Sequence, residues 1–209
     1  MVELDLLRAG DPRLEPSTAL TTAIAHLEWA LLDDDDDCPR RHRDRVLEFL
    51  AEHPDAAHRA CETGHLTGSA VVVDGSASRT LLLHHRKLGR WFQPGGHADG
   101  DTNLAAVALR EATEETGIAG LAVTTRAIDV DVHFVEPPGE RAHLHLDIRY
   151  LVLAPPGAVE VGNEESLALR WLTEAELDHL EPGVDASTRR LVHRGLAAAA
   201  PLVRRRLVA

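Results

Sequence analysis

The chain has few cysteines and few positive charges, and each shortage excludes a class of protein. Its 209 residues include two cysteines, Cys38 and Cys61, which do not form a CxxC pair. A disulfide framework or a thiolate metal site is therefore not predicted, and a reducing cytoplasm is the expected location. Lys and Arg number 22 against 34 Asp and Glu, which gives a formal net charge of −12. Binding to a nucleic-acid backbone is not expected of so acidic a chain.

Long apolar runs are also missing. No segment approaches the length of about 20 apolar residues that crosses a membrane. The stretch from Met1 to Asp5 lacks the basic-then-apolar order of a signal peptide. We therefore expect a soluble protein without membrane contact. Apolar residues still make up 44% of the chain, which is enough for a core of ordinary size, although only 3% are aromatic.

The first 64 residues are predicted to form a helical extension. Ser17 or Thr18 can cap a helix over residues 17–32, where apolar residues recur at helical spacing. A second helix is expected over 39–53, because proline suits the first turn of a helix. This extension could shape a pocket, mediate a homodimer or cover an exposed sheet edge, and its sequence suits all three.

Residues 65–209 carry the pattern of one domain of strands and helices. Strands are expected at 69–73, 80–84, within 121–135, at 143–153 and at 170–172. Helices are expected from Asn103 to Gly117, after Thr173 and over 185–200. Loops are expected at Asp33 to Asp37, where like charges repel, and at Pro137 to Gly139. This order predicts an α+β fold with a mixed sheet.

The most informative stretch is Gly95-Gly96-His97 and the acidic helix that follows it. Leu104, Val107, Glu111 and Glu115 fall on one stripe of this helix. The first half of the stripe is apolar and should face the core, whereas the second half directs two carboxylates the same way. Inward carboxylates are unfavourable unless a cation or hydrogen-bond donors compensate them. A divalent metal held by oxygen ligands behind the glycine turn is the simplest compensation.

These residues resemble the Nudix box, G-x5-E-x7-R-E-U-x-E-E-x-G-U, in which U is a bulky apolar residue. The matching positions are Gly96, Arg110, Glu111, Glu114, Glu115, Gly117 and Ile118. Two positions depart from the pattern, since Thr102 stands in place of the first Glu and Ala112 in place of the first U. The resemblance implies an α/β/α sandwich with a mixed sheet. Residues 65–209 would then be the catalytic domain and residues 1–64 an addition to it.

The resemblance also implies the roles of the motif residues. Glu111 and Glu115 would be the main ligands of Mg²⁺ or Mn²⁺, with Glu114 as a further ligand and the Gly95 carbonyl as a backbone ligand. Arg110 is expected to orient a motif carboxylate. The metal would polarise a phosphoanhydride and lower the pKa of an attacking water. The implied activity is hydrolysis of a small-molecule substrate, a nucleoside diphosphate linked to another group.

Thr102 supports a second interpretation, because a hydroxyl cannot supply the charge of the glutamate that it replaces. Asp99 and Asp101 lie in the same loop and could substitute for it. Asp101 or Thr102 could instead cap the motif helix. The alternative function is therefore a nucleotide-binding or sensing module of the same fold, with weak or no catalysis. An isomerase of related fold is disfavoured, since the stretch from Gln93 to His97 contains no cysteine.

A row of polar residues lies in the strand at 143–153. His143, His145 and Asp147 alternate, so their side chains share one face. Two histidines and a carboxylate on one face could bind a transition metal or contact substrate phosphates. They could equally form a solvent-facing row, with the apolar residues between them filling the core. Both interpretations stay open from the sequence.

Further candidates for substrate contact lie outside that strand. His97 follows the glycine turn directly, Asp101 lies in the loop before the motif helix, and Arg86 lies in a basic loop before the turn. A general base could come from Glu164 or Glu165, because Nudix enzymes often carry a late acid in a loop. Both glutamates also suit a loop that is merely solvated.

Overall fold

The computed structural model describes residues 4–32, 36–136 and 141–208. The loop expected at Pro137 to Gly139, and residues 33–35 of the acidic loop, lie outside these ranges. In chain order the elements are β1 (Leu6–Arg8), η1 (Pro12–Leu14), α1 (Leu20–Glu28), α2 (Asp37–Glu52), β2 (Gly64–Val73), β3 (Thr80–His85), β4 (Arg90–Phe92), β5 (Gly95–His97), α3 (Leu104–Thr116), β6 (Ala122–Thr124), β7 (Asp129–Val135), β8 (His143–Leu153), β9 (Ser166–Leu172), η2 (Glu174–His179) and α4 (Ala186–Val208).

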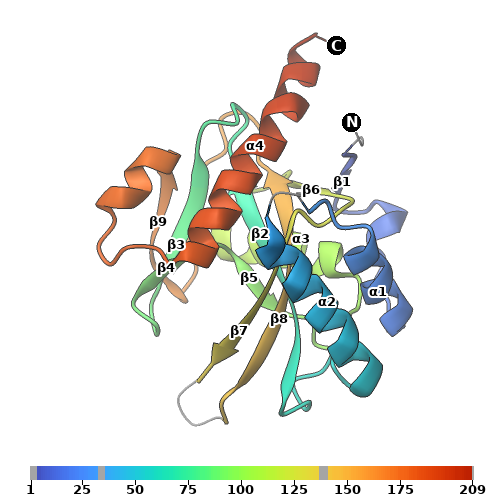
Figure 1. Cartoon of the computed structure of the whole chain (residues 1–209). Coiled ribbons are helices and arrows are strands. Elements are labelled where there is room, and N and C mark those ends of the chain that lie inside the picture. Colours follow the sequence, from blue (N-terminus) through green and yellow to red (C-terminus); the bar gives the residue numbers. More distant parts are fainter. Residues whose placement is uncertain (1–3, 33–35, 137–140, 209) are drawn as a thin grey trace.

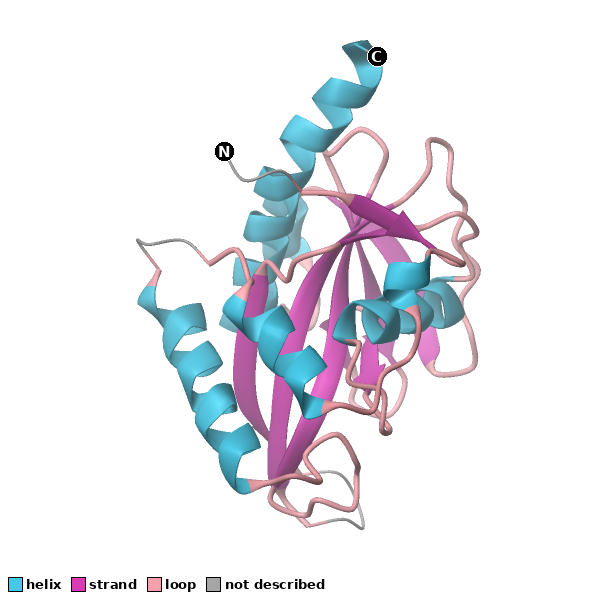
Figure 2. Ribbon diagram, turned by 90° about the vertical axis from the view of Figure 1, so that its right-hand side faces the viewer, coloured by secondary structure: helices cyan, strands magenta, loops and turns pink. Residues whose placement is uncertain are grey.

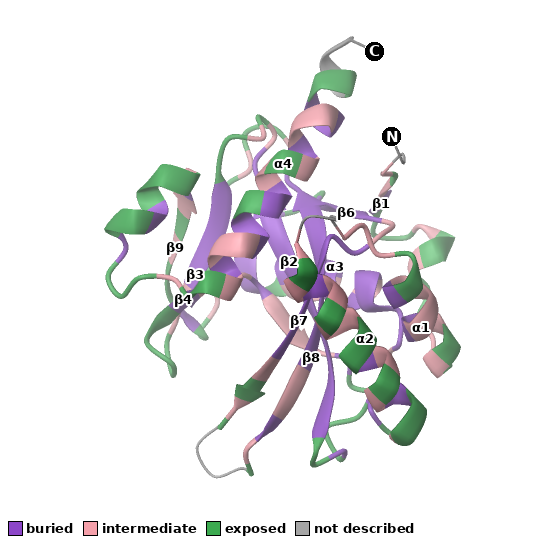
Figure 3. Cartoon of the chain, in the orientation of Figure 1, coloured by how far each residue is buried: buried purple, intermediate pink, exposed green. Residues whose placement is uncertain are grey.

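The strands form one mixed sheet around the parallel pair β2 and β8. The strand order is β1-β6-β8-β2-β3-β4, while β5 pairs with β2, β7 with β8 and β9 with β3. The β2–β8 ladder runs from Gly64 opposite Leu144 to Val73 opposite Leu153. Strand β2 is buried along its whole length, as Figure 3 shows at the centre of the molecule. The predicted α+β fold with a mixed sheet is confirmed.

Helices cover both faces of this sheet (Figures 1 and 2). Alternate residues of a strand point to opposite faces. Leu66, Ala70 and Val72 therefore belong to the core cluster that contains the apolar side of α3. Val71 and Val73 belong to the cluster that contains the apolar side of α4. Helix α2 lies along β7, where His42 Nδ1 accepts a hydrogen bond from the Val132 N–H at 3.1 Å and so satisfies an edge donor.

The motif helix forms where the sequence predicts it. Its N-cap is Asn103, whose side chain accepts a hydrogen bond from the Ala106 N–H, and its C-cap is Gly117 at φ 64°. That left-handed conformation favours glycine, so the predicted end of the helix is confirmed. The prediction that Asp101 or Thr102 caps the helix is wrong, because Asn103 makes the capping bond. Leu104 and Val107 are fully buried, as the apolar half of the stripe requires.

Three other local predictions need correction. Asp37, expected in the acidic loop, is the first residue of α2, and Asp36 caps that helix. Helix α1 begins after Ala19 without a side-chain cap, so neither Ser17 nor Thr18 caps it. Strand β2 starts at Gly64 rather than at residue 69. Gly64 and Gly68 conceal the first half of the strand in the sequence, because glycine is uncommon in strands. The division of the chain at residue 64 stays a prediction, although β1 from the first part pairs with β6 of the second.

Candidate metal and phosphate site

The glycine strand β5 lies directly against the acidic end of α3. A Cβ atom placed on Gly96 would lie 2.4 Å from the Glu111 carboxylate, so glycine is needed for this approach. The Gly95 N–H donates a hydrogen bond of 2.9 Å to Glu115 Oε2. The two inward carboxylates thus face the backbone of the glycine strand, as the helical stripe predicts.

Both carboxylates are held in surroundings that disfavour their negative charge. Burial raises the pKa of Glu115 to about 7, which the nearby Glu111, Glu165 and Glu114 reinforce and the Gly95 N–H opposes. Burial also raises the pKa of Glu111, against the effect of Arg110. A cluster of acids with one backbone donor and one guanidinium is under-compensated. The oxygen donors around the glycine strand therefore fit a hard divalent cation.

Arg110 occupies the place expected of a positioning residue. Its Nη2 donates to Glu111 Oε1 at 3.0 Å and lies 3.4 Å from the His97 carbonyl oxygen. The guanidinium therefore links the motif helix to the glycine strand. Glu114 is exposed, and its charge adds to the raised pKa values of Glu111 and Glu115.

In the loop before α3, the side chains at positions 99, 101 and 102 bind other groups of the protein. Thr102 is fully buried, and its Oγ1 lies 2.9 Å from the Ser17 carbonyl oxygen and 2.8 Å from that of Ala19. Asp101 Oδ1 accepts hydrogen bonds from the N–H groups of Ser17 and Asn103. Asp99 forms a two-bond ion pair with Arg59, at 2.7 Å for each bond. All three side chains thus have partners within the protein.

The loop before β9 approaches the carboxylates from another side. The Arg86 guanidinium donates to the Glu164 carbonyl oxygen at 2.8 Å, and the Arg86 N–H donates to that of Glu165. Arg86 therefore holds this loop through its backbone. Both glutamate side chains are exposed, and the charge of Glu165 contributes to the raised pKa of Glu115.

The polar row of β8 is not solvent-facing, so that interpretation is wrong. His143 and Asp147 are only 6% and 2% exposed. Asp147 accepts hydrogen bonds from the hydroxyls of Thr67 and Ser69 at 2.9 and 2.8 Å. Its other oxygen accepts from Arg149 Nε at 2.7 Å.

Two functional features in this region were missed in the sequence. His65 of β2 lies opposite His145 in the parallel ladder. This pairing was missed because the strand was predicted to begin at residue 69, after His65. Arg149 continues the polar row and forms ion pairs with Asp129 and Asp131 of β7. The alternating pattern of this strand places Arg149, two residues after Asp147, on the same face, so the sequence contained this signal.

Comparison with known proteins agrees with this geometry. A family model for the NUDIX domain matches residues 64–194, more than half of the chain, so the chain belongs to the NUDIX family. It is 33% identical over 141 residues to a Mycobacterium tuberculosis (strain CDC 1551 / Oshkosh) protein named "Putative 8-oxo-dGTP diphosphatase 3", covering 59% of this chain and 58% of that one. A MutT-like protein of Streptomyces ambofaciens is 29% identical over 134 residues, which cover 63% of this chain and 77% of that protein. The chain thus spans 58% of the length of the first of these relatives.

Solved structures share the fold. A C. elegans Ap4A hydrolase in a binary complex aligns with a TM-score of 0.52 and 20% identity, covering 65% of this chain and 98% of that one. The NUDIX domain of Shewanella oneidensis NrtR, complexed with ADP ribose, aligns with a TM-score of 0.51 and 18% identity, covering 71% and 97%. At these identities the likeness concerns the fold alone. Among the residues described above, no helix is long and apolar enough to cross a membrane.

Proposed function

We propose that this chain is a divalent-metal-dependent pyrophosphohydrolase that cleaves a phosphoanhydride in a nucleoside diphosphate linked to another group. The observation that carries the proposal is the pair Glu111 and Glu115, both turned inward against Gly95 and Gly96. Glu115 is buried and Glu111 half-buried. Two such acids, set against a glycine backbone, are stabilised by a cation and disfavoured without one. Membership of the NUDIX family supports the same reaction class.

The metal-holding residues in this proposal are Glu111, Glu115 and Glu114, together with the Gly95 carbonyl oxygen. Bound Mg²⁺ or Mn²⁺ would supply charge to polarise the phosphoanhydride. The protein's own contribution is to hold the ligands in place before substrate arrives. Arg110 fixes the Glu111 carboxylate, and the Gly95 N–H fixes one oxygen of Glu115.

A proton acceptor for the attacking water is available in the same region. Glu164 and Glu165 remain our candidates for the general base, since their loop lies close enough for Glu165 to affect the titration of Glu115. His97, at the end of the glycine strand, is a candidate for contact with substrate phosphates, as are His143 and His145 of β8. Arg86, Asp101 and Asp147 would act indirectly, through the segments that they hold.

The proposed substrate class is supported by chemistry that the similar proteins share. Their names refer to 8-oxo-dGTP, Ap4A and ADP ribose, and each of these compounds joins a nucleoside to another group through a phosphoanhydride. A small nucleotide-type molecule is therefore the proposed partner of this chain. The cytoplasm is its proposed location, given the two unpaired cysteines.

The test is turnover of a panel of nucleoside diphosphate derivatives, dinucleoside polyphosphates and nucleotides with Mg²⁺, Mn²⁺ or chelator. Glu111→Gln and Glu115→Gln should each lower kcat by at least about 100-fold, as loss of a main electrostatic group does. Glu48→Gln, on the exposed side of α2, is the matched control and should leave kcat unchanged. Wild-type turnover in both motif variants would refute the proposal.

One observation favours a second function. Thr102, in place of the first glutamate of the box, is turned away to the N-terminal segment. The site thus has one acid fewer than the family pattern. Metal-dependent nucleotide binding without turnover in the same panel would identify a sensing module instead.

A further inference from the structure

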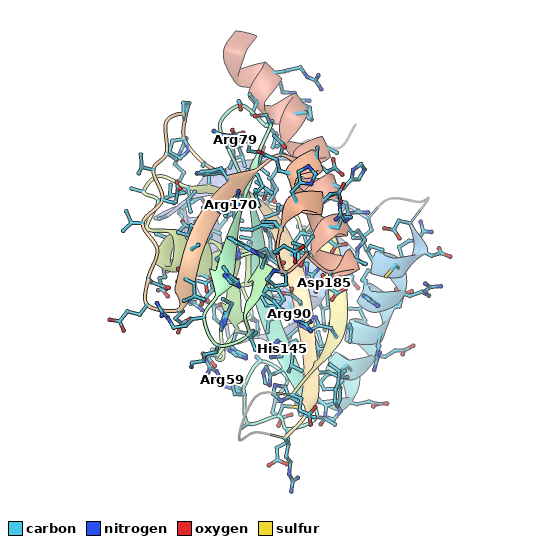
Figure 4. All side chains as sticks on the ribbon, turned by 90° about the vertical axis from the view of Figure 1, so that its left-hand side faces the viewer. Arg59, Arg79, Arg90, His145, Arg170 and Asp185 are labelled. Carbon is cyan, nitrogen blue, oxygen red and sulfur yellow. The ribbon has the colours of Figure 1, made fainter. Side chains whose placement is uncertain are left out.

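A second group of potential metal ligands lies across the glycine strand from the carboxylates. Nitrogen atoms of His65, His143 and His145 lie within 4.8 Å of one another. His97 completes the group, with its ring centroid 4.9 Å from that of His65 and 5.0 Å from that of His145. Figure 4 views the molecule from the side of β9 and β3, and in this view His145 lies below Asp185, the residue before α4.

The buried nitrogens of this group have no partners. Five buried side-chain nitrogen or oxygen atoms of the described residues make no hydrogen bond, and four of them are His65 Nδ1, His65 Nε2, His143 Nε2 and His145 Nε2. Buried polar atoms almost always have a partner, and leaving one without costs about 1–3 kcal/mol. Four such atoms at one place therefore indicate that something else binds there.

The backbone holds these rings in a ligand-like arrangement. His65 and His145 are direct partners in the parallel ladder, and Gly64 lets the two strands approach beside them, since a Cβ there would lie 2.8 Å from Leu144. His143 Nδ1 lies 2.8 Å from the Arg141 carbonyl oxygen. A proton on Nδ1 satisfies that carbonyl and leaves Nε2 as an acceptor within the group. Metal-binding histidines usually have such an outer partner.

We propose that His65, His143 and His145 bind one divalent transition-metal ion of the zinc type. Imidazole nitrogens favour Zn²⁺ over Mg²⁺, so this ion would be distinct from the cation of the carboxylates. Tetrahedral Zn²⁺ with Zn–N bonds of about 2.0–2.1 Å separates its ligand atoms by about 3.3 Å. The nitrogens, which lie within 4.8 Å of one another, need to close by at most about 1.5 Å to bind one ion. Three protein ligands leave one position for water, His97 or a substrate oxygen.

A competing group lies nearby in the chain. His53, Asp55 and Cys61 also place one ligand atom each within 4.8 Å of the others. Asp55 is exposed, however, and burial raises the pKa of the Cys61 thiol, which opposes the thiolate form. None of its nitrogen or oxygen atoms is among the buried atoms without partners. The histidine group is therefore the better site.

The test is calorimetric titration of the chelator-treated full chain with Zn²⁺ in the presence of excess Mg²⁺. We expect one Zn²⁺ per chain, and at least about tenfold weaker binding in His65→Gln and in His145→Gln, since loss of even an outer partner lowers metal affinity by about 10–100-fold. Cys61→Ser is the control for the competing group and should bind Zn²⁺ as the wild type does. The double variant Glu111→Gln/Glu115→Gln should also bind normally, which separates this site from the proposed hydrolase site.

Zinc-edge X-ray absorption of the wild-type complex gives a second result that needs no variant. Scattering from imidazole and other nitrogen or oxygen ligands alone is expected, whereas a sulfur shell at about 2.3 Å would place the ion at a cysteine, Cys61 or Cys38. The proposal is overturned by that sulfur shell, by unchanged affinity in both histidine variants, or by the absence of Zn²⁺ binding in the wild type.

Discussion

At the scale of single residues, Glu115 makes the metal-free protein sensitive to pH. Its pKa rises from 4.5 in the unfolded chain to about 7 in the folded one, chiefly because it is buried. Between these values the folded state binds a proton that the unfolded state does not. Stability from this group is therefore full below pH 4.5 and is lost as the pH rises to 7. The shift corresponds to about 3 kcal/mol as an upper figure.

We predict that Glu115→Gln is more stable than the wild type at pH 8 in chelator, by about 1–3 kcal/mol. The difference should shrink toward zero near pH 4.5, because the wild-type carboxyl is then neutral as well. Urea denaturation at several pH values measures it. The half-buried histidines His97 and His145, whose pKa values burial lowers, titrate in the opposite sense, but they are present in both proteins and cancel in the difference. A difference that does not change with pH would contradict the assignment.

At the scale of elements, the loop before α3 holds the N-terminal segment to the domain. Thr102 contacts the carbonyl groups of Ser17 and Ala19, while Asn103 Nδ2 donates to those of Arg13 and Glu15. The position that carries a glutamate in the family pattern thus serves here to fix the segment that leads into α1. From these contacts we infer a structural role for Thr102 in this chain.

Thr102 variants test this role. Thr102→Val should lower the free energy of unfolding by about 1–3 kcal/mol, because buried carbonyl groups lose a donor. Thr102→Ser keeps the hydroxyl and should lose less. Thr102→Glu should destabilise the protein, since it would bury an unpaired charge. Denaturation measures the stability of these variants, and Mg²⁺ titration measures their metal affinity. A Thr102→Glu variant that is stable and binds Mg²⁺ more tightly than the wild type would show instead that position 102 is a metal-ligand position that threonine cannot fill.

At the scale of the whole molecule, a buried charge network joins the C-terminal helix to the sheet. Arg149 of β8 pairs with Asp147, Asp129 and Asp131, and Arg190 of α4 pairs with the same two β7 aspartates. The Arg149 side chain is 3% exposed. Burial alone would lower the pKa of Arg149, but the three aspartates raise it. Burial alone would raise the pKa of Asp131, but a hydrogen bond with His133 and the charge of Arg149 lower it.

We predict that Arg149→Met destabilises the protein by about 3–5 kcal/mol, because it leaves buried carboxylates without their cation. Hydrogen exchange in α4 should also become faster, since the helix loses part of its attachment. Arg141→Met is the control, because the Arg141–Glu62 pair is 84% and 72% exposed and contributes little. Equal stability of the two variants would show that the network does not hold the helix.

Local chemistry made much of the fold and the proposed site predictable. The limits of β8 follow from its alternating pattern, and the motif helix ends at Gly117 because glycine takes the left-handed conformation there. The inward direction of Glu111 and Glu115 follows from helical periodicity. Each of these features depends on residues within a few turns or one strand of each other, so a single sequence is enough to derive them.

The tertiary structure alone decided which distant residues meet. His65 lies beside His145, 80 positions away, because two parallel strands pair in one register, and no local pattern specifies that register. Thr102 likewise contacts residues of the N-terminal segment, and Arg149 meets the aspartates of β7. Strand register and the docking of helices are set by packing across the whole core. The sequence by itself therefore determined the motif and its helix, whereas the tertiary structure decided which groups Thr102 contacts and brought the histidines together.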